Sequence, residues 1–371
     1  MSLRNGHYST GLPHANGNNS NGPHVTDSPT PGNGSEEYAS DSPDETSSME
    51  ELAPEEFPSY FSERDNHLFH SSSSPYPLPV DGPEQHVLPA VYYRKCRAPK
   101  PLFSQRLNTN HDLLLQFYGA HYVGPVPDVL VQSERPRMAL DICTGTGKWV
   151  MDMAQEFPGV HFQGFDIVPI QTRYPLPNVQ FEIHDVNTNF RWQDATFDLI
   201  NARDINMAVR DFRQVVEEVA RVLRPGGLLI SYEWSPYPAF HPSLDRDPSI
   251  HAPASCRLAE AVRGAFLSTR GLHLLATEVP SILVNTGLFA DVSPNQHHIP
   301  VGAWHADPSL RRIGTMCREA QEQYADSIKP LLLEAGWEEA DASRILADYI
   351  QEIRTVGGLV IVLHTVHARK V

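Results

Sequence analysis

Residues 138–150 contain the side chains whose types and spacing are best suited to chemistry. They read Met-Ala-Leu-Asp-Ile-Cys-Thr-Gly-Thr-Gly-Lys-Trp-Val, with Asp141 ahead of Gly145 and Gly147. Because glycine has no β-carbon, such a turn lets backbone N–H groups approach a nucleotide-like ligand closely. Asp166 follows 25 residues after Asp141, at the end of a second apolar run. A carboxylate at about this spacing binds ribose in doubly wound sheets, so the pair predicts a site for such a ligand.

A second group of polar residues follows two later strands that the sequence predicts. Arg203, Asp204 and Asn206 come directly after the fourth strand, and Glu233 and Trp234 end the fifth. Ligands of open α/β sheets bind at the carboxyl ends of the strands. These residues are therefore candidate substrate-facing groups, although ordinary loop polarity explains any one of them equally well.

The histidines near the end of the chain raise the question of a metal site. They are His297, His298, His364 and His367. Residues three apart on a strand point to opposite faces, so His364 and His367 cannot bind one ion together. We expect no metal site. The sequence also shows no Ser-His-Asp arrangement of known spacing and no phosphate-binding Gly-x-x-x-x-Gly-Lys-Ser/Thr run.

The elements that must position these residues alternate between apolar runs and helical patterns. This alternation indicates βαβ units and an α/β fold with a doubly wound, mostly parallel sheet. Beyond the strand that opens at Met138, the predicted strands are 160–166, 179–183, 197–202 and 228–234. Asp211 is the expected N-cap of a helix that Pro225-Gly226-Gly227 ends.

The flanking regions read mainly as helices. Helical patterns occupy residues 108–122 and 150–157, the stretch 256–267 within 236–286, and residues 308–335 and 338–354. Asp307-Pro308 is a favourable helix start. Pro330 is expected to kink or divide that helix. Residues 359–366 form the last predicted strand.

The first 56 residues differ from the rest in composition. They hold ten acidic residues and one basic residue, Arg4, with few large apolar side chains. Such a segment cannot bury enough surface to offset its ordering entropy, so we expect a disordered acidic tail over 1–56. Residues 57–105 are expected to be an extended segment packed on the domain, and 106–371 the domain itself, with its ligand-binding core at 138–234.

The charge and the cysteines restrict the class of protein. Among 371 residues, 45 acidic residues against 29 basic ones give a net charge of −16, which argues against a direct nucleic-acid binder. The four cysteines have no paired spacing, as expected of reduced thiols inside a cell. The sequence shows no secretory signal and no membrane span. We expect an intracellular protein, cytoplasmic or nuclear, and read the basic run 94–100 as a solvated loop rather than a nuclear signal.

Together these motifs resemble a class I S-adenosylmethionine-dependent methyltransferase. The resemblance is most specific over residues 138–234, through the glycine turn, Asp166, Asp185, the Phe197-Asp198 strand and the run Leu223-Arg-Pro-Gly-Gly227. It is closest to the fungal LaeA-like methyltransferases, whose segments are similar to residues 76–85, 106–111, 181–187 and 299–304. The resemblance implies a Rossmann-like, seven-stranded sheet with an antiparallel C-terminal strand, and a helical lid or substrate region at about 236–286 and 306–354.

The resemblance also implies roles for individual residues in holding S-adenosyl-L-methionine. Asp141 orders the turn and helps hold the amino group of the cofactor, while Gly145 and Gly147 give its methionine and ribose parts room. Cys143 stands where the family has a third glycine. It weakens cofactor binding if that position needs a left-handed backbone.

The remaining roles lie beyond the glycine turn. Asp166 accepts the ribose hydroxyls and Ile167 lies against the adenine. Asp185 receives the adenine amino group, with Val186 packing beside it. The resemblance also makes Arg203 a cofactor-binding candidate. No residue compels a particular catalytic group; Arg203 and Glu233 are the candidates.

The implied activity is methyl transfer to an unidentified acceptor, with a small molecule of secondary metabolism as the first choice. The alternative is a LaeA-like regulator that keeps the fold and binds protein partners through its N-terminal tail, with weak or no methyl transfer. A nicotinamide-dependent dehydrogenase also explains a glycine turn followed by an acid. The Asp185 strand, the Leu-Arg-Pro-Gly-Gly turn and the C-terminal strands favour the methyltransferase.

Overall fold

A mostly parallel sheet forms the centre of the computed structural model, which describes residues 52, 55–64, 67–80, 102–131, 135–172 and 174–371. Its parallel strands are β3 (Arg137–Ile142), β4 (Val160–Asp166), β5 (Val179–Ile183), β6 (Phe197–Arg203) and β7 (Leu223–Trp234), in the order β5-β4-β3-β6-β7. The strands begin within one residue of their predicted positions except β7. Nearly all of the predicted tail, and the basic run 94–100, lie outside the described residues.

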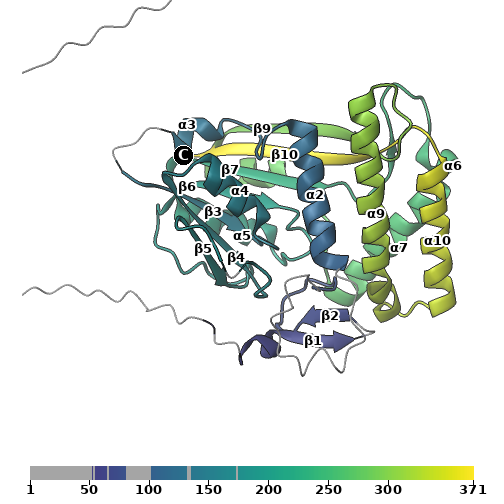
Figure 1. The fold of residues 1–371 in the computed structure, drawn as a ribbon, viewed down its shortest axis with the longest axis horizontal. Helices are drawn as coiled ribbons and strands as arrows, with labels where there is room; N and C mark the ends of the chain where they lie inside the picture. The colour runs from purple at the N-terminus through teal and green to yellow at the C-terminus, as the bar shows by residue number, and fades with distance from the viewer. Residues whose placement is uncertain (1–51, 53–54, 65–66, 81–101, 132–134, 173) are drawn as a thin grey trace, which may run out of the picture. The chain divides into compact units, whose positions relative to one another are not determined.

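Antiparallel strands complete the sheet beyond β7. The strand β10 (Leu359–Lys370) pairs with β7, and β9 (Phe289–Pro300) pairs with β10. These seven strands confirm the predicted Rossmann-like sheet with its antiparallel C-terminal strand. A two-residue strand, β8 (Ala239–Phe240), adds a short pairing at the start of β10. The long β9 and β10 cross behind α2 in Figure 1.

The helix α5 (Phe212–Val222) forms as its sequence predicts, but it ends differently. The Asp211 side chain accepts hydrogen bonds from the backbone N–H groups of Arg213 and Gln214, which makes it the N-cap. The helix ends because Leu223 already has an extended backbone, with φ −72° and ψ 141°. Pro225-Gly226-Gly227 therefore lies inside β7, where the pairing with β6 shifts register, rather than between helix and strand.

Two further helices lie close to the glycine turn. The helix α2 (Leu102–Tyr118) begins earlier and ends earlier than the predicted 108–122, so the expected boundary at residue 105 falls inside it. The helix α4 (Lys148–Glu156) follows the turn and buries Val150, Met153 and Ala154, as its periodicity predicts. A short helix, α3 (Val126–Leu130), precedes β3.

The helical region consists of α6 (Pro248–His251), α7 (Pro253–Arg270), α8 (Val279–Thr286), α9 (Pro308–Glu334) and α10 (Glu339–Thr355). Asp307 caps α9 through the N–H groups of Ser309 and Leu310. Pro330 does not divide α9, which continues to Glu334. Ile328 and Leu331 on either side of the proline are completely buried, so packing holds the helix together across the lost hydrogen bond.

The N-terminal segment is more structured than the predicted extended chain. It contains a 3-10 turn, η1 (Phe57–Tyr60), and a hairpin of β1 (Phe61–Arg64) with β2 (His67–His70). Buried Leu68 and Val80 pack with Val168 and Ile170, which follow β4. The segment is therefore anchored close to the end of the strand that carries Asp166.

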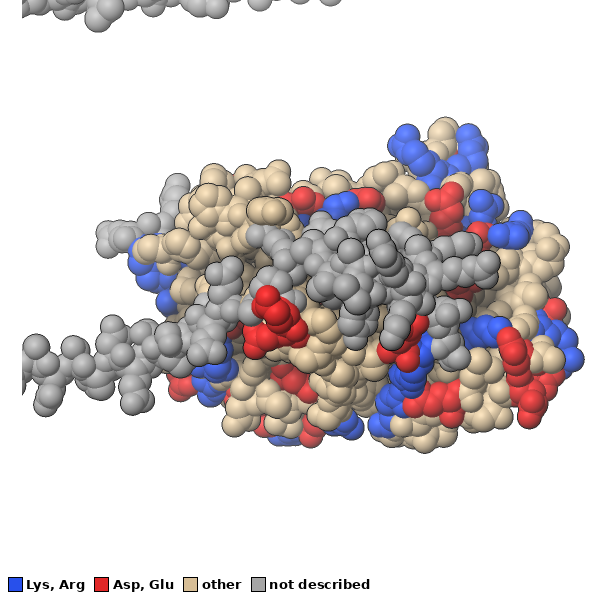
Figure 2. Space-filling view, turned by 60° about the horizontal axis from the view of Figure 1, so that its bottom comes forward, with Lys and Arg blue, Asp and Glu red and all other residues tan. Residues whose placement is uncertain are grey.

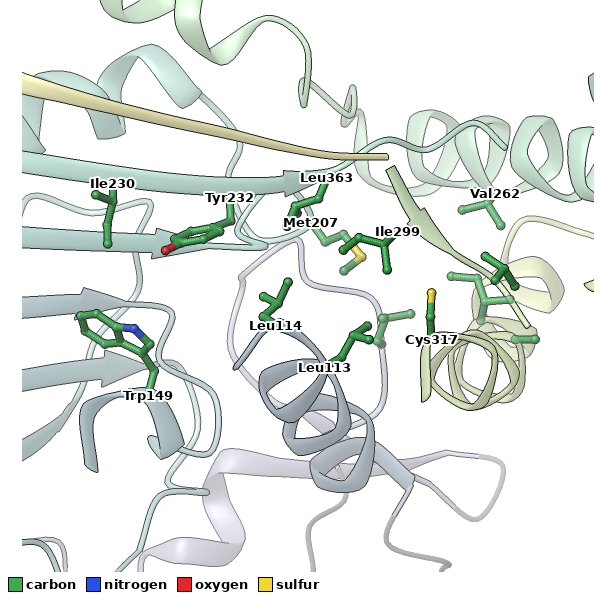
Figure 3. Close-up of a cluster of buried hydrophobic side chains, with 14 of the residues drawn as sticks. Leu113, Leu114, Trp149, Met207, Ile230, Tyr232, Val262, Ile299, Cys317 and Leu363 are labelled. Carbon is green, nitrogen blue, oxygen red and sulfur yellow. The ribbon is translucent and has the colours of Figure 1, made fainter. Parts of the chain in front are cut away.

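One hydrophobic cluster joins the sheet to the helices (Figure 3). Trp149 and Tyr232 lie on the sheet side of this cluster, and Val262 and Cys317 lie on the helical side. Leu113 and Leu114 of α2 lie between the two sides. Because this core is continuous, α7, α9 and α10 are fixed relative to the carboxyl end of β7.

The structure describes the surface charge and three of the four cysteines. Basic and acidic side chains occur in mixed groups on the face shown in Figure 2. Cys143, Cys256 and Cys317 are free thiols, while Cys96 lies outside the described residues. None of the described helices is long and apolar enough to cross a membrane.

Candidate functional site

The turn between β3 and α4 needs glycine at two positions. Gly145 has φ +58° and Gly147 has φ +74°, in the left-handed region that other residues rarely adopt. A β-carbon at Gly147 would lie 2.5 Å from the Phe181 ring, and one at Gly145 would lie 2.7 Å from Leu107. These close approaches fix the path of the backbone that the sequence predicts as the ligand-binding turn.

Cys143 also has a left-handed backbone, with φ +55°. The position therefore favours glycine, which is the condition under which the sequence predicts that Cys143 weakens cofactor binding. An L-residue in this conformation costs roughly 1–2 kcal/mol. Burial raises the pKa of the thiol, with the nearby Asp166 and Asp141 charges adding to the effect. The side chain is therefore a protonated, partly buried thiol rather than a nucleophile.

Asp141 holds the turn in place from the end of β3. One carboxylate oxygen accepts a hydrogen bond from the Thr144 hydroxyl at 2.6 Å, and the other accepts one from the Asn201 amide at 2.6 Å. Burial raises the pKa of Asp141, against the opposing effect of the Arg203 charge. Asp141 thus links the turn to β6 through these two hydrogen bonds.

Asp166 meets the glycine turn directly. Its Oδ2 accepts a hydrogen bond from the Gly145 N–H at 2.8 Å, and its Oδ1 accepts one from the Ile167 N–H at 2.8 Å. Burial raises the pKa of Asp166 to about 7, although these backbone donors favour the charged form. The spacing of glycines and acid in the sequence therefore corresponds to contact in the fold.

Asp185 and Val186 follow β5, next to the end of β4. Asp185 Oδ1 accepts hydrogen bonds from the Asn187 backbone at 3.0 Å and from its side-chain amide at 2.8 Å. Val186 is buried in the cluster that includes Phe165. One oxygen of Asp185 is thus occupied in a turn.

A cavity of about 50 Å³ lies against the glycine turn. Asp141, Cys143 and Gly145 line it from the turn, and α2 closes it from the other side through Leu107 and His111. The ends of β6 and β7 contribute Arg203, Asp204 and Trp234. Three of the predicted rim residues are thereby brought to the same cavity as the turn.

Arg203 is held by a pair of residues that the sequence analysis did not select. His111 Nδ1 lies 3.2 Å from the Arg203 guanidinium, and His111 Nε2 lies 2.8 Å from Asp152 Oδ2. Burial, with the Arg203 charge, lowers the pKa of His111 to about 2, so the ring is neutral. A neutral ring that accepts from Arg203 and donates to Asp152 satisfies all three groups.

The same neighbourhood contains a possible ligand set for a metal. His111, His121 and Asp152 place three potential ligand atoms within 4.8 Å of one another. None of them is among the histidines that the sequence analysis considered. The sequence drew attention only to His111, as the last residue of the segment 106–111 that resembles the LaeA-like group. It did not single out His121 and Asp152, because their contact depends on the packing of α2 against α4.

A larger cavity of about 150 Å³ adjoins the first. The two share Asn110, Asp204 and Trp234 in their linings, so these residues stand at the junction. The walls of the larger cavity are mainly apolar and come from α7, α9, α10 and the start of β10. The residues predicted as a helical lid or substrate region thus enclose a cavity next to the candidate cofactor site.

Glu233 has a structural role in this arrangement. Its Oε1 accepts a hydrogen bond from the Ile205 N–H at 3.0 Å, and its Oε2 accepts one from the Asn206 side-chain amide at 2.8 Å. Burial raises the pKa of Glu233 well above its usual value, and the Asp204 charge adds to the effect. Both oxygens hold the loop after β6, which makes Glu233 a poor choice as the reacting group.

Asp204 differs from Glu233 in its surroundings. Its backbone is left-handed, with φ +57°, and its N–H donates to the Tyr232 carbonyl at 2.8 Å. Its carboxylate lies 4.0 Å from the Arg106 guanidinium. Burial raises its pKa to about 6, against the opposing charges of Arg106 and Arg203. The strained backbone thus presents an ionisable carboxylate at the junction of the two cavities.

Comparison with known proteins finds a methyltransferase domain and relatives named as a regulator and as a methyltransferase. Residues 139–227 match the model of a methyltransferase domain. The chain is 27% identical over 247 residues to "Secondary metabolism regulator laeA" of Coprinopsis cinerea, covering 65% of this chain and 61% of that protein, less than two thirds of its length. It is 26% identical over 279 residues to "Methyltransferase pytC" of Aspergillus terreus, covering 73% of this chain and 75% of that protein.

Among solved structures, the chain is similar to a phosphoethanolamine N-methyltransferase 2 of Haemonchus contortus in complex with S-adenosyl-L-methionine. The TM-score is 0.40 at 16% identity, over 71% of this chain and 57% of that one. Residues 139–227 thus match a methyltransferase domain, and the chain resembles the class I methyltransferases of the LaeA-like group.

Proposed function

We propose that the protein transfers a methyl group from S-adenosyl-L-methionine to a small-molecule acceptor of secondary metabolism. The observation that carries the proposal is the contact between Asp166 and the Gly145 N–H at 2.8 Å, beside a cavity at the strand ends. A buried carboxylate and bare backbone at one point suit a ligand that presents both hydroxyls and a compact polar chain.

The residues present fit this cofactor. Asp166 and Ile167 would hold the ribose and the adenine face, with Asp185 and Val186 on the next strand end. The glycine turn and Asp141 would hold the amino-acid part. Arg203, kept in place by His111 at 3.2 Å, supplies a cation for a carboxylate. When bound, the cofactor supplies an electrophilic methyl group on a sulfonium.

The acceptor is proposed to occupy the larger cavity. Its mainly apolar walls suit a small molecule and would limit the access of water to the reacting groups. One relative is named "Methyltransferase pytC", and another from Strobilurus tenacellus is named "Methyltransferase str2". Both names support catalysis.

A second function has its own support. Several relatives carry the name "Secondary metabolism regulator", among them the one from Coprinopsis cinerea. A protein of this kind would bind a regulatory partner, and the N-terminal tail is the proposed contact. In that case cofactor binding would be retained without appreciable methyl transfer, or lost.

Calorimetric titration of the full chain with S-adenosyl-L-methionine, S-adenosylhomocysteine and NAD⁺ tests the cofactor. We expect both adenosyl ligands to bind at micromolar concentration and NAD⁺ to show no binding. Binding of NAD⁺ alone would support a dehydrogenase, and no binding of any of the three at millimolar concentration would contradict the proposal.

Transfer of labelled methyl from the cofactor into a cell extract then separates catalysis from regulation. The proposal predicts label in the organic-soluble fraction. Cofactor binding without label in any fraction would favour the regulatory function, and label confined to protein would contradict a small-molecule acceptor.

A further inference from the structure

The larger cavity has two opposite charges in an otherwise mainly apolar lining. Arg106, whose side chain is 3% exposed, and Asp204 face each other at 4.0 Å. Burial disfavours the charged form of Glu233, the other carboxyl group in the lining. A ligand with its own charge would disturb this balance in a site where burial already penalises charge. The lining therefore favours a neutral ligand.

Most polar groups of the lining already have partners inside the protein. The Tyr349 hydroxyl donates to Gln321 Oε1 at 2.8 Å, and the Ser255 hydroxyl donates to Glu352 at 2.7 Å. The Asn206 amide is bonded to Glu233. Among the described residues, no hydrogen-bond donor lies within bonding distance of the Asp204 carboxylate, which has only the 4.0 Å ion pair with Arg106. Asp204 is thus the acid best placed to receive a hydrogen bond from a ligand.

We propose that the larger cavity binds a neutral, mainly apolar molecule with an acidic hydroxyl, a phenol or an enol, and that Asp204 accepts the proton of that hydroxyl. The proposal rests on the proposed function and names its acceptor class and its base. Asp204 lines both cavities, so it stands where the cofactor site and the acceptor site would meet.

The proposed proton transfer and methyl transfer balance in atoms and electrons. An Asp204 carboxylate oxygen takes the hydroxyl proton, while the acceptor oxygen uses its electron pair to bond the methyl carbon of the sulfonium donor. The carbon–sulfur bond breaks, and its electron pair remains on sulfur as a neutral thioether. A carboxylate with a pKa of about 6 matches a phenol, whose pKa is about 10, far better than an alkanol.

Several groups around Asp204 set the pH range in which it can act. Arg106 from α2 and Arg203 from β6 favour the carboxylate. Glu233 from β7, Tyr324 from α9 and Tyr76 from the segment after β2 interact with the Asp204 charge. The pKa of each tyrosine is raised above its usual value, mainly by burial, so neither ionises near pH 6. Asp204 is therefore the group expected to titrate there.

Binding of naphthalene probes to the full chain tests the proposal without any turnover. The probes are 2-naphthol, its methyl ether 2-methoxynaphthalene, the anion 2-naphthoate and the cation 2-naphthylmethylammonium. Their binding is measured by the change in their fluorescence. At pH 7.5 we expect 2-naphthol to bind at least tenfold more tightly than either charged probe. Its affinity should rise between pH 5 and 7.5 with a midpoint near 6, because Asp204 ionises over that range.

The variant Asp204→Asn should weaken 2-naphthol binding about tenfold and abolish its pH dependence, with no effect on the methyl ether, which has no hydrogen to donate. Asparagine tolerates the left-handed backbone, so the variant should fold. Asp291→Asn is the matched control, because Asp291 also has a positive φ, 52°, but is exposed on β9. It should behave as the parent protein does.

Three results would overturn the proposal: no binding of 2-naphthol at millimolar concentration, equally tight binding of a charged probe, or equal 2-naphthol binding by Asp204→Asn and the parent. The probes are measured without cofactor, so this outcome is separate from the cofactor titration. Loss of cofactor binding with intact Asp204-dependent probe binding would reject the proposed function and leave only the inferred class of ligand for the larger cavity.

Discussion

The carboxylates at the two ends of strand β6 differ in how far the protein compensates their negative charge. Asp198, near the amino end, is 4% exposed and is surrounded by the guanidinium groups of Arg135, Arg137 and Arg224 at 2.5, 2.7 and 3.0 Å. Burial alone would raise its pKa, but the hydrogen bonds from Arg135, the Met138 N–H and Arg137 lower it. This carboxylate is fully compensated within the protein.

At the carboxyl end of the sheet, the burial of the acidic side chains outweighs the compensation of their charge by hydrogen bonds and nearby cations. The pKa values of Asp141, Asp166, Asp204 and Glu233 are all raised, in each case chiefly by burial. Groups held in this way occur preferentially at functional sites, because ligands supply what the fold leaves out. The contrast indicates that the amino-end network stabilises the fold and that the carboxyl-end acids are placed for ligands.

The strongest test of this contrast is Asp166→Asn. Hydrogen bonds to charged groups contribute roughly 1.5–3 kcal/mol, and about 1.4 kcal/mol is tenfold in affinity. We therefore expect S-adenosylhomocysteine to bind about 10- to 100-fold more weakly by calorimetry. The free energy of unfolding should change little, because removal of the buried charge offsets the loss of one of the two backbone hydrogen bonds that Asp166 accepts. Unchanged affinity for S-adenosylhomocysteine in a folded variant would contradict the placement of the carboxyl-end acids for ligands.

The converse substitution is Asp198→Asn. It leaves three arginines short of their acceptor and should lower the free energy of unfolding in urea by about 1–3 kcal/mol. The loss stays below that of a fully buried pair because the arginine side chains are 42%, 22% and 27% exposed. Cofactor affinity should change less than twofold. A large loss of affinity with normal stability would show that this network also serves the site.

The pH dependence of stability should have opposite signs at the two ends. The folded pKa values of Asp166 and Asp204 are raised to about 7 and about 6, so their contribution to stability is full below about pH 4 and is lost as pH rises through 6 to 7. Asp198 has a lowered pKa, so its contribution is full above about pH 4 and is lost on further acidification.

Urea denaturation of the ligand-free protein from pH 5 to 8 measures the first effect. The stability of the parent relative to the double variant Asp166→Asn, Asp204→Asn should fall over this range. Taking the difference removes the opposite contribution of the buried histidines, such as His111, whose pKa is lowered. A difference that stays constant or rises with pH would contradict the account.

The smallest expected effect is that of Cys143→Gly. Glycine removes the left-handed strain at φ +55° but also gains freedom in the unfolded chain, and these effects nearly cancel. Cofactor affinity should stay within threefold of the parent value or improve, as measured by the same calorimetry. A tenfold loss would mean that the Cys143 side chain contacts the ligand.

The sequence was sufficient for features that depend on local pattern. The strands, the Asp211 N-cap and the meeting of Asp166 with the glycine turn follow from periodicity and spacing. It was misleading at Pro225 and Pro330, where strand pairing and tertiary packing override the local tendency of proline. It could not reveal the pairing of Arg203 with His111, 92 residues apart, or the cavity under α7, α9 and α10, because both depend on long-range packing.

A crystal structure of the full chain with S-adenosylhomocysteine would locate the proposed cofactor site. We expect the ribose hydroxyls on Asp166, the amino-acid part at the turn of Cys143, Gly145 and Gly147, and the sulfur directed toward Asp204 and Trp234. Density for the ligand at any other place, with Asp166 still bonded only to backbone N–H groups, would contradict this expectation.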